Sequence, residues 1–64
     1  MANRDEIRVL QTTNYYQLLM LKHMNEKKGI KVEGLKTIIG VAKAAMTEPD
    51  IAWVEKQVSE ACED

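Results

Sequence analysis

Residues 14–24 read NYYQLLMLKHM, a stretch whose apolar side chains point to nearly every side of a helix. Outside this stretch, spacings of three and four residues continue an apolar stripe along one side of a helix over residues 4–28. The stripe consists of Ile7, Leu10, Asn14, Leu18, Leu21 and Met24, and it is widened by Val9, Tyr16 and Met20. These residues cover about half of the helix surface, well beyond the roughly 100° of a helix with one buried face. The pattern predicts that two neighbouring elements cover this helix.

Three large side chains do not fit the inward-facing stripes. Tyr15 and Leu19 lie four residues apart, on the side of the first helix that also carries charged residues. Trp53 lies about a third of a turn from the inward stripe of the last helix, given 3.6 residues per turn. Because aromatic residues are enriched among interface hot spots, we predict that Tyr15, Leu19 and Trp53 are exposed anchors for a partner. The alternative for these side chains is packing at the edge of the core.

Local signals mark both ends of the first helix. Asn3 and Glu6 form a capping pair, in which the Asn side chain accepts a free amide of the first turn. Gly29 follows two lysines and can take the left-handed conformation that closes a helix. These signals predict a helix over residues 4–28.

The second helix is predicted from spacing rather than from its ends. Apolar residues three and four apart run over residues 32–46, namely Val32, Leu35, Ile39, Ala42 and Met46. The start has no capping residue, so an extended segment at residues 30–32 is an alternative. Gly34 and Gly40 each cost about 1 kcal/mol relative to Ala inside a helix. Their presence suggests a close approach by another backbone.

The third helix has the clearest start. Thr47 can cap it, Pro49 fits the first turn, and Asp50 completes a capping pair, which predicts a helix over residues 48–62. No linker or internal repeat interrupts the sequence. The fold class is therefore predicted to be all-α, with one three-helix domain over residues 1–64.

The small size of the chain favours self-association. A chain of 64 residues buries only about 60% of its unfolded surface and is marginally stable alone. Cys62 is the only cysteine and His23 the only histidine, so an intrachain disulfide and a Cys/His zinc site are excluded. Oligomerisation is the remaining support for so small a domain. We therefore expect a helical homodimer.

The sequence lacks the signatures of catalysis and of membrane insertion. No glycine-rich phosphate loop or group of convergent polar residues is present, so we expect a non-enzymatic protein without cofactor or metal. No apolar run approaches the eighteen or so residues of a membrane span, and the N-terminus is charged where a signal peptide would be apolar. A cytoplasmic location is the expectation.

The charge distribution leaves two other functions open. Up to Thr47 the net charge is +4, and from Glu48 onward it is −5. Residues 41–54 resemble a helix-turn-helix, although Met46 stands where such motifs usually have glycine, so a small DNA-binding regulator is one alternative. The acidic last helix would repel phosphate and makes nucleic acid an unfavourable partner. An acidic inhibitor or adaptor for a basic surface is the other alternative. The favoured function is a regulatory or interaction module that self-associates and binds a second protein.

Overall fold

The computed structural model describes residues 3–63, and among these residues it contains three α-helices and no strand. The helices are α1 (Arg4–Lys27), α2 (Glu33–Ala44) and α3 (Glu48–Cys62). They confirm the predicted all-helical fold, and their bounds lie within two residues of the predicted ones. The second helix differs most, because it begins at Glu33 and ends at Ala44.

Local hydrogen bonds explain where α1 begins and ends. The amide of Glu6 donates to the Asn3 side chain at 2.8 Å, which is the predicted cap. At the other end, Gly29 has a φ of 77°. The amide of Gly29 donates to the Glu26 carbonyl at 3.0 Å, and that of Ile30 to the Asn25 carbonyl at 2.8 Å. This pair of bonds is a Schellman motif, which requires the left-handed residue that glycine supplies.

The starts of α2 and α3 differ in part from the prediction. Val32 precedes α2 in an extended conformation and makes no side-chain cap, in agreement with the extended alternative for this segment. Thr47 occupies the N-cap position of α3 and Pro49 lies in its first turn, but the Thr47 side chain makes no capping hydrogen bond. The expected reciprocal cap with Asp50 is therefore wrong. The Asp50 carboxylate instead accepts two hydrogen bonds from Arg8 of α1.

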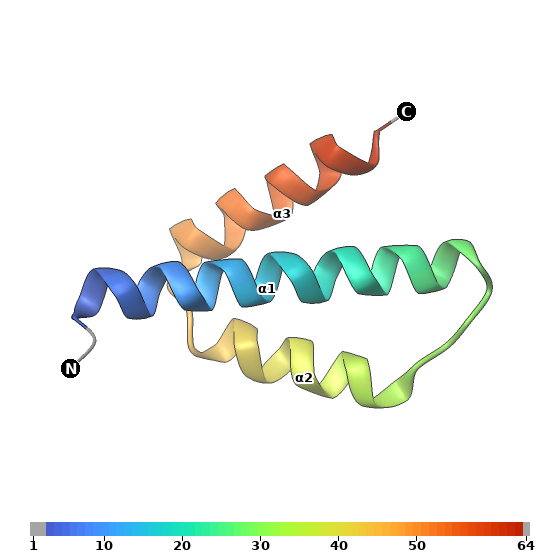
Figure 1. Ribbon diagram of the computed structural model, residues 1–64, viewed down its shortest axis with the longest axis horizontal. Helices are drawn as coiled ribbons and strands as arrows, with labels where there is room; N and C mark the ends of the chain where they lie inside the picture. Colours follow the sequence, from blue (N-terminus) through green and yellow to red (C-terminus); the bar gives the residue numbers. More distant parts are fainter. Residues whose placement is uncertain (1–2, 64) are drawn as a thin grey trace.

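The three helices form a flat arrangement with α1 in the middle (Figure 1). α2 runs back along one side of α1, and α3 lies on the other side and diverges towards its C-terminal end (Figure 1). Both outer helices pack against α1 and only slightly against each other. The principal extents are 40 × 26 × 18 Å, so the shortest dimension is less than two helix diameters of about 10 Å. The two neighbours predicted for the first helix are thus present, but they leave one face of it open.

The core is small, and it is centred on a residue that the sequence pattern placed outside. The buried apolar side chains among residues 3–63 are Tyr15, Leu35 and Val54, one from each helix. Tyr15 is 2% exposed. The expected exposure of Tyr15 is therefore wrong, because its side of α1 is the side that both α2 and α3 approach.

Neither helical glycine makes the expected close contact inside the subunit. A Cβ atom built at Gly34 or at Gly40 would meet nothing within 4 Å beyond its own helix. The interpretation that another backbone of the same chain approaches these glycines is therefore wrong.

Candidate interaction surface

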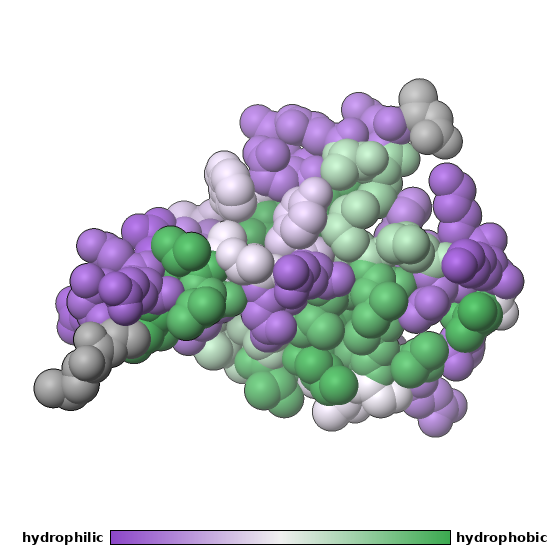
Figure 2. Space-filling model, in the orientation of Figure 1, coloured by the Kyte–Doolittle hydropathy of each residue, from purple (hydrophilic) through white to green (hydrophobic). Residues whose placement is uncertain are grey.

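The main apolar stripe of α1 faces solvent rather than the core. Ile7, Leu10, Leu21 and Met24 of α1 and Ile38 and Val41 of α2 are each 44–68% exposed, and we call these six residues the α1–α2 face. At 100° per residue the four members from α1 fall within an arc of about 100°. Figure 2 shows hydrophobic side chains gathered over α1 and α2 on the side of the molecule that it displays.

The exposed half of α1 carries no charge along most of its length. Between Ile7 and Asn25 the only charged residues are Arg8 and Lys22, and both belong to the opposite half of the helix. The neutral polar side chains of Asn14 and Gln17 interrupt the apolar residues near the middle of the helix. Because the exposed half of a solvated helix normally carries charged residues, this composition is typical of a surface that another element covers.

The surface area of the subunit supports the same conclusion. A folded monomer of 7.3 kDa should expose about 4,200 Å². This chain exposes 5175 Å². Its Cα radius of gyration is 12.4 Å, whereas about 11 Å is expected for a compact chain of this length. The excess surface, on the order of 1,000 Å², is comparable to the roughly 800 Å² that each partner buries in a standard protein interface.

Tyr15 links α1 to α3 through a polar contact. Its hydroxyl donates to Glu55 Oε1 at 3.1 Å. Glu55 Oε1 also lies 3.9 Å from Lys43 Nζ of α2, so its carboxylate stands between a phenol and an ammonium group. Burial raises the pKa of Tyr15, and its hydrogen bond to Glu55 raises it further. These contacts give Tyr15 a structural role and remove it from the accessible surface.

The other two predicted anchors lie in different surroundings. Leu19 is half-buried and lines a shallow hollow between α1 and α3, together with His23 and Val58. Trp53 is 55% exposed, as expected, and its role as an anchor stays a prediction. The structure therefore does not bring Tyr15, Leu19 and Trp53 together in one accessible patch.

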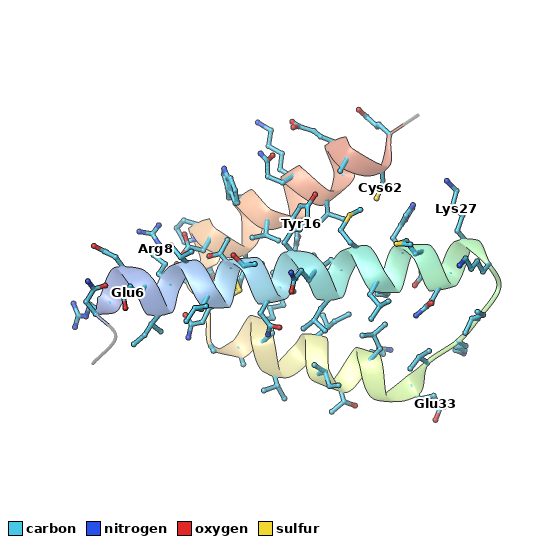
Figure 3. The ribbon with its side chains drawn as sticks, viewed as in Figure 1. Glu6, Arg8, Tyr16, Lys27, Glu33 and Cys62 are labelled. Atoms are coloured by element: carbon cyan, nitrogen blue, oxygen red, sulfur yellow. The ribbon has the colours of Figure 1, made fainter. Side chains whose placement is uncertain are left out.

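Trp53 lines an open groove between the N-terminal half of α1 and the first turns of α3. Val9, Thr13, Tyr16 and Pro49 also line it. Figure 3 shows Tyr16 projecting from the middle of α1 on the side of α3. This groove is lined by α1 and α3 and is distinct from the α1–α2 face, so it offers a second apolar surface.

Arg8 and Asp50, which also line this groove, form an ion pair. Arg8 Nε donates to Asp50 Oδ2 at 2.8 Å and Arg8 Nη2 donates to Asp50 Oδ1 at 2.7 Å. The hydrogen bonds and charge of Arg8 lower the pKa of Asp50, and the same contacts raise the pKa of Arg8. The two-bond geometry fixes the first turn of α3 against α1.

The remaining polar groups offer little chemistry. Within residues 3–63 no three His, Cys, Asp or Glu side chains converge as a metal site would require. The Cys62 thiol lies 3.8 Å from the Met20 thioether, a neighbour that cannot take up its proton. The helix-turn-helix alternative covers the end of α2 and the start of α3, two helices that pack on α1 rather than on each other.

Comparison with models of protein families, with curated proteins and with solved structures gives no match to this chain.

In the described part of the chain, no helix combines the length and the apolar character that crossing a bilayer demands.

The sequence predicted the exposure of Trp53 but not the α1–α2 face. The four members from α1 were assigned to a stripe covered by neighbouring helices, because apolar periodicity alone does not show which face is covered. The signal that could have identified the face is the absence of charge on this half of α1 over nearly twenty residues.

Proposed function

We propose that this protein is a non-enzymatic interaction module that self-associates as a homodimer through its α1–α2 face. The observation that carries this proposal is the exposure of six large apolar side chains on one side of α1 and α2, on a half of α1 that carries no charge between Ile7 and Asn25. Large exposed apolar patches mark protein interaction sites. The groove lined by Trp53 would bind a second protein.

The energetics of a short chain favour a second copy as the occupant. A domain of 64 residues has a free energy of unfolding of roughly 3–10 kcal/mol. Covering the α1–α2 face removes apolar surface from water, at about 25 cal/mol for each Å². Dimerisation therefore adds to the stability of a fold whose described core consists of one buried apolar side chain per helix.

Sedimentation velocity of the full chain over a micromolar concentration series tests the proposal. The expected result is a concentration-dependent shift from a 7.3 kDa species to one of twice that mass. A species that remains monomeric throughout the series would overturn the proposal.

The Trp53 groove needs a separate test, because self-association does not depend on it. Trp53→Ala should leave the dimer intact and reduce capture of a foreign protein from the native host. A dimer that is lost in this variant would place the contact surface on the groove rather than on the α1–α2 face.

A further inference from the structure

The exposed side of α1 has the spacing of a coiled-coil seam. The residues Ile7, Leu10, Asn14, Gln17, Leu21 and Met24 alternate at intervals of three and four residues. This interval is that of the a and d positions of a heptad repeat, here over three heptads. All six side chains are exposed in the single subunit. A seam of this kind packs against a partner helix, and α2 and α3 both lie elsewhere.

We infer that the partner is a second copy of this chain, with its α1 antiparallel to the first and a two-fold axis passing between Asn14 and Gln17. This inference rests on the proposed function and specifies its geometry. The seam is symmetric about that point: Ile7 would face Met24 of the second copy, Leu10 would face Leu21, and Asn14 would face Gln17. Every apolar residue then meets an apolar residue, and every amide meets an amide.

Charges at the ends of the seam favour the antiparallel orientation. Glu6 and Lys27 lie at opposite ends of α1 (Figure 3) and occupy equivalent g positions beside the seam. In an antiparallel pair, Glu6 lies beside Lys27 of the second copy, and the two-fold axis repeats this opposite-charge contact. In a parallel pair Glu6 and Lys27 of the two copies would not lie beside each other, and the two acidic N-terminal turns would lie at the same end. The antiparallel orientation also opposes the two helix dipoles.

α2 extends the same interface. Gly34, Ile38, Val41 and Ala45 alternate at intervals of four, three and four residues, and all four are exposed. The middle of α2 lies beside the middle of α1 (Figure 1), so one two-fold axis serves both helices. Ile38 would then face Val41 of the second copy, and Gly34 would face Ala45. The open space around Gly34 lets the backbone of the second α2 approach closely.

The central amides fix the register. If the two copies of α1 slipped by one heptad, Asn14 would face Met24 and Gln17 would face Leu21. Both amides would then be covered without a hydrogen-bond partner, which is unfavourable. Polar residues at single core positions are known to specify register and orientation in coiled coils.

Disulfide cross-linking in a Cys62→Ser background tests the orientation. Leu10→Cys and Leu21→Cys variants are oxidised separately and then after mixing. The antiparallel pair predicts a covalent dimer in the mixture and little in either variant alone, because a disulfide needs Cβ atoms about 4 Å apart. Covalent dimers from each variant alone, and none specific to the mixture, would overturn the inference while leaving the proposed function intact. Loss of all association in the Cys62→Ser chain would instead count against the proposed function.

A charge-exchange experiment gives an independent readout. Glu6→Lys should weaken association by about 2- to 30-fold, since two exposed ion pairs are lost and each contributes modestly. Combining Glu6→Lys with Lys27→Glu should restore it. A combined variant as weak as Glu6→Lys alone would overturn the antiparallel arrangement, and circular dichroism at high dilution checks that each variant remains helical.

Discussion

Replacing Leu10 with aspartate should dissociate the dimer without unfolding the subunit. Leu10 is 66% exposed in the single chain. Full burial of a Leu side chain contributes about 1.5–3 kcal/mol, so covering the exposed two thirds contributes about 1–2 kcal/mol. Because the two-fold axis places one Leu10 from each copy in the interface, the contribution to the dimer is about 2–4 kcal/mol. Since about 1.4 kcal/mol corresponds to a tenfold change, the dissociation constant of Leu10→Asp should rise at least about 30-fold.

The measurement is sedimentation velocity of the wild-type chain and of Leu10→Asp over the same concentration series. Helicity at high dilution should be unchanged, because most of the Leu10 side chain contacts water in the subunit. Ala52→Asp is the matched control, since it adds the same charge at an exposed position of α3 away from the α1–α2 face. The control should associate like the wild type.

Two outcomes would refute this reasoning. If Leu10→Asp associates with the wild-type dissociation constant, the α1–α2 face is not the contact surface. If Ala52→Asp weakens association as much as Leu10→Asp does, net charge rather than the apolar contact controls the dimer.

Three further predictions concern the fold of the subunit. Tyr15→Ala should lower the free energy of unfolding in urea by about 3–5 kcal/mol, because it leaves a cavity at the centre of the core; a loss below about 1 kcal/mol would contradict this. Arg8 lowers the pKa of Asp50, so their contact stabilises the fold above the pKa that Asp50 has when unfolded, and this stabilisation is lost as the pH falls through the folded pKa. The free energies of unfolding of Arg8→Ala and wild type should therefore converge in acid. A difference that stays constant down to low pH would refute this prediction. Gly29→Ala should lower the melting temperature by about 4–8 °C or more, because the φ of 77° costs an L-residue about 1–2 kcal/mol. An unchanged melting temperature would show that another conformation closes α1.

The helix ends were predictable because their causes are local. Asn3 caps an amide three residues away, and Gly29 closes α1 through carbonyls of the preceding turn. Pro49 acts within the first turn of α3. The local prediction was wrong at Thr47, whose side chain makes no capping hydrogen bond. It also could not show that Asp50 pairs with Arg8, which lies 42 positions away in the sequence.

Which side of α1 faces the core could not be deduced from periodicity. Tyr15 and Leu10 are both large apolar residues on a helix that is apolar on most sides. The structure buries Tyr15 because α2 and α3 approach that side and because Glu55, 40 positions away in the sequence, accepts the Tyr15 hydroxyl proton in a hydrogen bond. Trp53 was identified as exposed because its position on α3 departs from a stripe that a single neighbour covers.

The placement of α1 between two helices that barely touch each other affects how the subunit opens. α3 is held to α1 by the Arg8–Asp50 pair, by the hydrogen bond from Tyr15 to Glu55 and by Val54. The ion pair of Lys43 with Glu55, which joins α3 to α2, is half exposed and therefore weak. α3 can thus detach while the α1–α2 hairpin remains closed, and the reverse also holds. Amide hydrogen exchange should accordingly resolve two separate opening reactions with different protection factors, rather than the single cooperative event of a closed three-helix bundle.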